Sequence, residues 1–189
     1  MAVKYMIPNE HLFALGNVVI AFSKLEHCFI KVFESLTKLD DKKIEIIMGA
    51  LSFDDKFRIV RSLILELMRD KEKEEFKKIL KAVDKARIDR NYLMHGLYEM
   101  SPDRGLAEIS KSNSRMDLRF SKRGITSEEI IICAAHLNKA TKDLCIFLGK
   151  VNILDATGPF LMELIMEEHR IKTEEHRIKI VMEELRNKF

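Results

Sequence analysis

The spacing of apolar residues predicts a chain made mainly of α-helices. Apolar side chains recur at intervals of three and four residues over several long stretches, which is the spacing of one helix face. We expect long helices over about 9–37, 53–68, 72–95 and 127–151, with a short helical segment at 44–51. In the first helix the predicted buried stripe consists of Leu12, Leu15, Val19, Phe22, Leu25, Phe29, Val32 and Leu36.

Capping sequences predict where two of these helices begin. Ser52 is followed three residues later by Asp55, and Thr126 is followed three residues later by Glu129. A hydroxyl at the N-cap with an acidic side chain three positions on satisfies backbone N–H groups at both places. We therefore expect helices to start directly after Ser52 and after Thr126.

A different pattern separates the last two of these helices. Residues 106–109 and 116–120 alternate apolar and polar side chains, and 101–105 has the composition of a turn. The pattern predicts a small β-hairpin inserted near 97–125. Between 101 and 125 there are six basic residues and three acidic ones, an excess that equals the net charge of +3 of the whole chain. The basic residues are Arg104, Lys111, Arg115, Arg119, Lys122 and Arg123.

Two interpretations of this basic segment stand. Arg115, Arg119 and their neighbours would track a nucleic-acid backbone if the hairpin lay beside a phosphate-binding site. Alternatively, they are solvated side chains that keep the edge of a hairpin from pairing with another chain.

The end of the chain is predicted to form a separate element. Residues 155–159 break the helical pattern, and 160–189 has the pattern of one long, highly charged helix in which E-E-H-R-I-K occurs twice, seven residues apart. In the middle of this helix alternate seam positions are acidic, at Glu168 and Glu175, so the apolar stripe is thin and suits packing along the bundle or along a second subunit. The predicted organisation is a helical bundle at 1–158 and a C-terminal helix at 159–189.

Composition narrows the class of protein. The chain has 189 residues, of which 47% are hydrophobic and 33% charged, and this fits a folded domain with a substantial core. The three cysteines, Cys28, Cys133 and Cys145, lie inside helical patterns without C-x-x-C spacing, as in reduced cytosolic proteins. No signal-peptide pattern and no uninterrupted apolar window of ~18 residues is present, so we expect a cytoplasmic protein without a membrane segment.

One charged residue interrupts the apolar face of the third long helix, 72–95. The stripe through Phe76, Leu80, Val83 and Ala86 continues at the same spacing to Arg90 and then Leu93. An arginine in a core-facing position requires a partner, because an unpaired buried charge costs several kcal/mol, on the order of the desolvation penalty of one ion. Arg90 is therefore the first candidate for a functional residue.

A second charge of opposite sign is predicted to face inward from the first helix. The helical neighbours of Glu26 are Phe22, Phe29, Ile30 and Phe33. One hypothesis is that Glu26 pairs with Arg87 or Arg90 and holds the arginine in place. The other is that Glu26 lies at the edge of the stripe and reaches water.

Three further residues accompany Arg90 at the end of its helix. His95 lies about 140° around the helix from Arg90, and Asn91 lies one turn below His95 on the same face. Gly96 is expected to end the helix in a left-handed conformation, which places His95 in the last turn. We expect Arg90 and His95 to flank a cleft in which a histidine gives or takes a proton.

The string Arg90-Asn91-Tyr92-Leu93-Met94-His95 resembles the R-x(4–6)-H signature of the HEPN superfamily of small α-helical domains. Leu25-Glu26 in the first helix and the segment 51–56 opening a later helix also resemble the HEPN layout, so the resemblance covers about residues 9–151. Many HEPN members are metal-independent ribonucleases that work as dimers in toxin or phage-defence systems, and others bind RNA without cleaving it.

This resemblance implies roles for individual residues. His95 would be the acid or base, Arg90 would clamp the phosphate and stabilise the transition state, and Asn91 would orient both. Arg87 could assist by contacting phosphate and Tyr98 by stacking on a base. A two-fold homodimer would bring two such sets around one phosphate. The alternative is a structural motif, in which Arg90 bridges helices through Glu26 and His95 forms a hydrogen bond near the helix end.

Other kinds of chemistry have no motif in this sequence. His169 and His176 are two turns apart, about 10 Å, too far to share a metal ion, and no Gly-rich phosphate loop, H-E-x-x-H or G-x-S-x-G is present. The expectation is thus an all-α antiparallel bundle with a small β-hairpin insertion and a long C-terminal helix. It would need no metal or cofactor and would act on RNA as a homodimer, or serve as a noncatalytic module that docks an enzyme or antitoxin partner.

Overall fold

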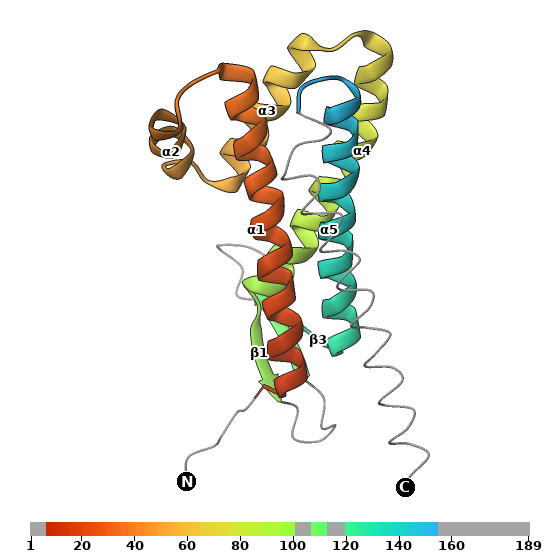
Figure 1. The fold of residues 1–189 in the computed structure, drawn as a ribbon. Coiled ribbons are helices and arrows are strands. Elements are labelled where there is room, and N and C mark those ends of the chain that lie inside the picture. The colour runs from red at the N-terminus through yellow and green to blue at the C-terminus, as the bar shows by residue number, and fades with distance from the viewer. Residues whose placement is uncertain (1–6, 101–106, 113–119, 155–189) are drawn as a thin grey trace, which may run out of the picture. The chain divides into compact units, whose positions relative to one another are not determined.

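The computed structural model describes residues 7–100, 107–112 and 120–154, and these form five helices and one small sheet. This agrees with the predicted all-α class carrying a small β insertion (Figure 1). The elements are α1 (Asn9–Thr37), α2 (Asp41–Gly49), α3 (Phe53–Leu67), α4 (Asp70–Met94), β1 (Leu97–Met100), β2 (Ala107–Ser112), β3 (Phe120–Gly124) and α5 (Ser127–Lys150).

The chain divides into two compact units, Met1–Leu144 and Cys145–Phe189. Every residue of the candidate site lies in the first unit. The predicted C-terminal helix at 159–189 lies outside the described residues, so that element and the predicted boundary at 158 stay predictions.

Both predicted capping boxes are present. The Ser52 hydroxyl accepts a hydrogen bond from the Asp55 amide at 3.2 Å and donates one to the Asp55 carboxylate at 2.6 Å. The Thr126 hydroxyl accepts from the Glu129 amide at 3.2 Å, and the Thr126 amide donates to the Glu129 carboxylate at 3.1 Å. These bonds fix the first residues of α3 and α5, as the sequence predicts.

The buried face of α1 matches the prediction only in its second half. Phe22, Leu25, Phe29 and Val32 are buried as expected, but Leu12 and Val19 are exposed, at 51% and 44%. Before Phe22 the buried residues of α1 are instead His11, Ala14, Val18 and Ala21. Apolar residues surround this part of the helix, so their spacing alone does not select the inward face, which consists of His11 and three small apolar residues.

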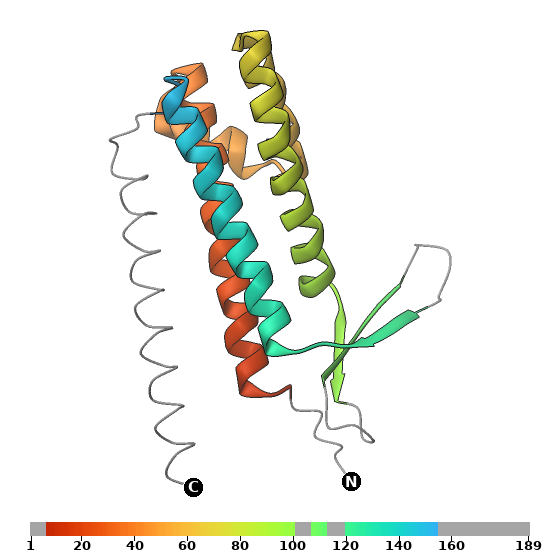
Figure 2. The same cartoon turned by 90° about the vertical axis from the view of Figure 1, so that its right-hand side faces the viewer.

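The β insertion has three strands where the sequence predicted two. The strand order is β1-β2-β3 with both pairs antiparallel, and Tyr98 lies opposite Ile109, which lies opposite Arg123. The additional strand, β1, follows α4 almost directly, and β3 leads into α5. The sheet therefore lies at the end of the bundle where α4 ends and α5 begins (Figure 2).

Gly96 does not adopt the left-handed conformation expected at the end of α4; position 96 carries glycine for a steric reason. The helix stops at Met94, His95 is the C-cap with φ −110° and ψ 4°, and the φ of Gly96 lies outside the left-handed range. A Cβ at position 96 would lie 2.4 Å from two side-chain carbons of Ile109, which is fully buried. Glycine fits here because the buried Ile109 side chain of β2 occupies the space that a Cβ would need.

By length and composition alone, α1 is apolar enough to cross a membrane, and 39% of its most apolar window is buried in this structure. The same property is found in core helices of soluble proteins, so one such helix is weak support for a membrane location. The cytoplasmic location stays a prediction.

Candidate functional site

Arg90 lies on the inward face of α4, as the apolar stripe predicts. Its guanidinium carbon is 4.1 Å from the centre of the Phe22 ring on α1, a cation–π contact. Its Nη1 donates to the Asn91 side-chain oxygen at 2.9 Å, and its Nε is buried without a hydrogen-bond partner. Burial lowers the pKa of Arg90, and attraction to Glu26 partly opposes this effect. Arg90 is thus held in place while part of its hydrogen-bonding capacity is unused.

Glu26 also faces inward, but the predicted direct pairing with Arg87 or Arg90 is wrong. The Glu26 carboxylate accepts a hydrogen bond from Lys56 Nζ on α3 at 2.5 Å. The Lys56 side chain is only 8% exposed and that of Glu26 is 33% exposed. The inner cluster therefore contains two cations, Lys56 and Arg90, around one carboxylate.

Aromatic rings surround this inner cluster between α1 and α3. Phe22 and Phe53 have ring centroids 4.6 Å apart, and Phe29 contacts Phe53 and Phe57 edge-on at 5.5 and 5.7 Å. Apolar surroundings of this kind strengthen the attraction between charges and make an unpaired charge costly. The geometry of Arg90, Glu26 and Lys56 is consequently well defined by packing.

Arg87 forms a structural link between helices. Its Nη1 donates to the Asp54 carboxylate on α3 at 2.7 Å, and its Nη2 donates to Asp84 on α4 at 2.8 Å. The expected role of Arg87 in phosphate contact is therefore not supported, because two carboxylates already occupy its guanidinium.

His95 and Tyr98 lie at the end of α4 in different surroundings. His95 is exposed, and its backbone N–H donates to the Asn91 carbonyl at 3.2 Å. The Tyr98 hydroxyl donates to the Leu93 carbonyl at 2.9 Å, and burial raises the pKa of Tyr98 to about 12. The Tyr98 hydroxyl thus satisfies a helix-end carbonyl and the base-stacking role of its ring stays a prediction, whereas His95 is exposed to solvent.

Of the six basic residues predicted to flank the site, only Arg123 has a side chain that the structure describes. Arg104, Arg115 and Arg119 lie outside the described residues. Arg123 is exposed, and its Nη1 donates to the Glu129 carboxylate at 2.9 Å. Its guanidinium carbon is 5.4 Å from the centre of the Tyr92 ring. Arg123 is therefore directed toward α4 and α5.

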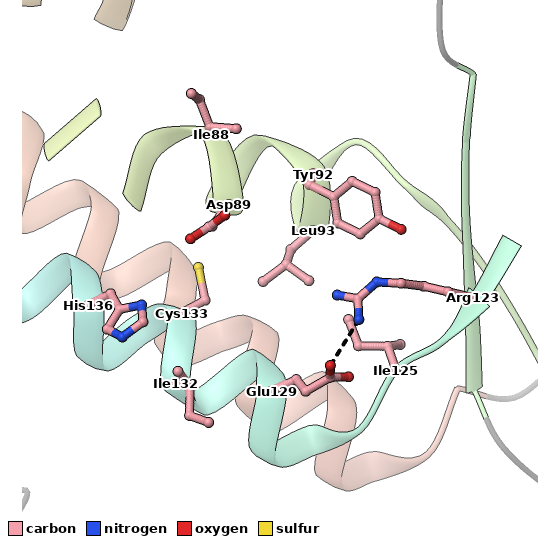
Figure 3. A pocket seen from close by; sticks show the side chains of 10 residues that line it. All are labelled: Ile88, Asp89, Tyr92, Leu93, Arg123, Ile125, Glu129, Ile132, Cys133 and His136. Carbon is pink, nitrogen blue, oxygen red and sulfur yellow. Dashed lines mark hydrogen bonds and ion pairs between the residues drawn. The ribbon is translucent and has the colours of Figure 1, made fainter. Parts of the chain in front are cut away.

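A pocket of about 560 Å³ opens between α4, β3 and α5 (Figure 3). We name it the groove pocket. Arg90, Asn91 and His95 do not line it, so the cleft expected between Arg90 and His95 is not this one. The groove pocket lies on the neighbouring face of α4, and its lining residues are Ile88, Asp89, Tyr92, Leu93, Arg123, Ile125, Glu129, Ile132, Cys133 and His136.

Polar groups converge on the groove pocket from both helices. Figure 3 shows Asp89 pointing from α4 toward Cys133 and His136 on α5, with the Arg123–Glu129 ion pair at the other end. Burial raises the pKa of the Cys133 thiol to about 11, with a further increase from the negative charge of Asp89 and a decrease from Arg90. The thiol therefore lies near both faces of α4.

Sequence reasoning missed the groove pocket. Its lining residues come from three elements between positions 88 and 136, and the motif at 90–95 drew attention to the other faces of the same helix. One signal was available in the sequence: Asp89 and Tyr92 are three residues apart, which places both on one helix face beside that of Arg90. Among the described residues, no three His, Cys, Asp or Glu side chains are placed to hold a metal ion.

Comparison of the chain with protein-family models, with curated proteins and with solved structures found no match in any of the three.

Proposed function

We propose that this chain is a HEPN-like, metal-independent endoribonuclease or RNA-binding protein of a toxin or phage-defence system, acting as a dimer. The main support for this proposal is that Arg90 has hydrogen-bond donors without partners. It lies inward, is held by Phe22 and Asn91, and keeps an unpaired Nε and a second nitrogen, Nη2, with no hydrogen bond to a described residue. A structural arginine would be expected to use these donors, as Arg87 does.

The chemistry of RNA cleavage suits the residues near the end of α4. Cleavage through the 2′-hydroxyl requires a base, an acid for the leaving oxygen, and positive charge where the phosphorane forms. His95 is exposed, so a bound substrate can reach its imidazole. Arg90, five residues earlier on α4, supplies the positive charge. One chain offers one histidine there, so a two-fold dimer would supply both the acid and the base.

The decisive experiment compares wild type with His95→Ala on single-stranded RNA in the presence of EDTA. Wild type is expected to cleave, and His95→Ala to lose roughly 100-fold or more of the rate, the range of a general acid–base contribution. His27→Ala is the matched control, because it removes another exposed imidazole from α1 and should leave the rate unchanged. Equal cleavage by wild type and His95→Ala would refute the catalytic role.

A second candidate function has its own support. On α1 the side chains of Leu12, Phe13, Val19 and Ile20 are exposed at 51%, 67%, 44% and 55%, and they lie on one side of the helix. An apolar stripe of this kind fits a noncatalytic module that dimerises or docks an enzyme or antitoxin partner. Binding of a partner without RNA cleavage, and loss of that binding in Phe13→Glu, would favour this alternative.

A further inference from the structure

The groove pocket contains a carboxylate with unused hydrogen-bonding capacity. Asp89 is half-buried, points into the pocket, and makes no hydrogen bond or ion pair with any residue that the structure describes (Figure 3). The other carboxylate there, Glu129, is bound by Arg123. A half-buried carboxylate without donors favours a ligand that brings donors to it.

The walls of the groove pocket suit a flat, largely apolar ligand. Ile88 and Ile132 form exposed rims, at 54% and 52%, on opposite helices, and the fully buried Ile125 forms part of the wall. The Tyr92 ring and the Arg123 guanidinium provide planar surfaces on which an aromatic ring stacks. At about 560 Å³, the pocket is within the ~300–1,000 Å³ range of small-molecule sites.

The charge of the groove pocket excludes a phosphate as its occupant. Asp89 and Glu129 carry two negative charges and Arg123 one positive charge, so these three groups leave one negative charge. An anion would meet repulsion there, whereas a neutral ring with paired N–H donors would not. The phosphate of a nucleotide would instead lie toward Arg90 and His95.

Among the nucleobases, guanine meets these requirements. Its Watson–Crick edge presents two neighbouring donors, N1–H and the N2 amino group, which match the two oxygens of one carboxylate. Adenine and cytosine place a ring acceptor beside their amino group, and uracil places carbonyls on both sides of its N–H, so each would set a lone pair against Asp89. Stacking on aromatic and arginine side chains is common in single-stranded RNA recognition.

We propose that the groove pocket binds a guanine base, with Asp89 accepting from its N1–H and N2 amino groups and Tyr92 and Arg123 stacking on the ring. As a substrate-specificity site, this rests on the proposed function: the guanine would belong to the RNA strand whose phosphate lies at Arg90 and His95. Tyr92 precedes His95 by three residues, about one helical turn, which places the base site and the proton-transfer site next to each other on α4.

The test is a titration of the full chain with guanosine, inosine and adenosine, followed by saturation-transfer NMR and calorimetry. Guanosine is expected to bind at least roughly ten-fold more tightly than adenosine, because a hydrogen bond to a charged group contributes about that factor. Inosine, which lacks the N2 amino group, should be intermediate. Equal affinity for guanosine and adenosine, or no binding of guanosine, would overturn the proposal.

Asp89→Asn isolates the carboxylate. The amide keeps the size of the side chain but presents only one acceptor, so guanosine binding is expected to weaken roughly ten-fold or more. Glu66→Gln, which neutralises an exposed acid on α3, is the matched control and should bind as wild type. Circular dichroism checks the fold of each variant, and unchanged guanosine affinity in a folded Asp89→Asn would contradict the role of Asp89.

The outcome separates this inference from the proposed function. His95→Ala should still bind guanosine, because His95 does not line the groove pocket. Guanosine binding without RNA cleavage would therefore refute only the catalytic proposal. RNA cleavage that shows no guanine preference, together with no guanosine binding, would refute only the base site.

Discussion

The charged side chains on two neighbouring faces of α4 differ in burial: they are packed among aromatic rings on one face and partly exposed to solvent on the other. On the inner face, Arg90, Glu26 and Lys56 lie among phenylalanine rings, and the Lys56 side chain is only 8% exposed. On the groove face, the Arg123–Glu129 ion pair is about half exposed, and Asp89 has no partner among the described residues. The two clusters adjoin at α4, where Asp89 and Arg90 are consecutive residues.

This difference teaches where charge contributes to stability and where it is free for binding. Charges packed in an apolar core depend on one another, because removing one leaves the others uncompensated. Charges in a solvated groove are screened by water and can be changed at little cost. The inner cluster should therefore be sensitive to loss of its single carboxylate, Glu26, and the groove face tolerant of single substitutions.

The largest stability effect should come from Glu26→Gln. The substitution leaves Lys56 and Arg90 without their carboxylate, and we expect a loss of about 2 kcal/mol in the free energy of unfolding. This is less than the ~3–5 kcal/mol for breaking a fully buried pair, because the side chain of Glu26 is 33% exposed. Urea denaturation measures the change.

The matched substitution on the groove face is Glu129→Gln. It removes the same charge from an ion pair whose partners are 51% and 43% exposed, so the loss should stay below about 1 kcal/mol. Equal losses in the two variants would show that the two faces do not differ in the way proposed.

A smaller effect is expected for Arg90→Met, which separates a functional arginine from a structural one. Methionine keeps an apolar stem near Phe22 and removes the buried, unpaired Nε, so the free energy of unfolding should change by less than about 1 kcal/mol. Any RNA cleavage should be lost, since the positive charge at the phosphate is gone.

Arg87→Met provides the comparison. Arg87 loses two ion pairs, to Asp54 and Asp84, and its side chain is only 21% exposed, so this variant should be the less stable of the two. A marked loss of stability in Arg90→Met and none in Arg87→Met would assign the structural role to Arg90 and weaken the proposed function.

The sequence predicted those features that depend on local spacing. Helix positions follow from apolar periodicity, and the starts of α3 and α5 follow from Ser52 and Thr126, whose capping partners are three residues away. The inward position of Arg90 could be predicted for the same reason, because it interrupts an otherwise regular stripe on a single helix.

Features that depend on distant residues could not be predicted in this way. One hypothesis for Glu26 was a pair with an arginine of α4 and the other was exposure to water, but its partner is Lys56, thirty positions away on another helix. Which cation reaches a partly buried carboxylate depends on how the helices pack, and no local pattern in the sequence predicts this. The groove pocket is similar, since Asp89, Arg123 and Cys133 meet only after the sheet has directed α5 back along α4.

The smallest expected effect concerns Cys133, whose thiol pKa is influenced by charges on both faces of α4. Burial and Asp89 raise the pKa of the thiol to about 11, from an ordinary value of 9.0, and Arg90 lowers it. A raised pKa in the folded state contributes stability below pH 9 that is lost as the pH rises from 9 to 11. Stability should thus fall across this alkaline interval, and alkylation of native Cys133 should be slow at neutral pH.

Site-resolved mass spectrometry after iodoacetamide treatment measures the alkylation rate at each pH. Asp89→Asn removes the negative charge and should move the rise in rate to lower pH, whereas Arg90→Met removes the positive charge and should move it to higher pH. Because Asp89 lies on the groove face and Arg90 on the neighbouring inner face, shifts of opposite sign would show that the Cys133 thiol responds to both clusters. Shifts of the same sign would mean that the thiol responds mainly to changes in burial and not to the charges on either face.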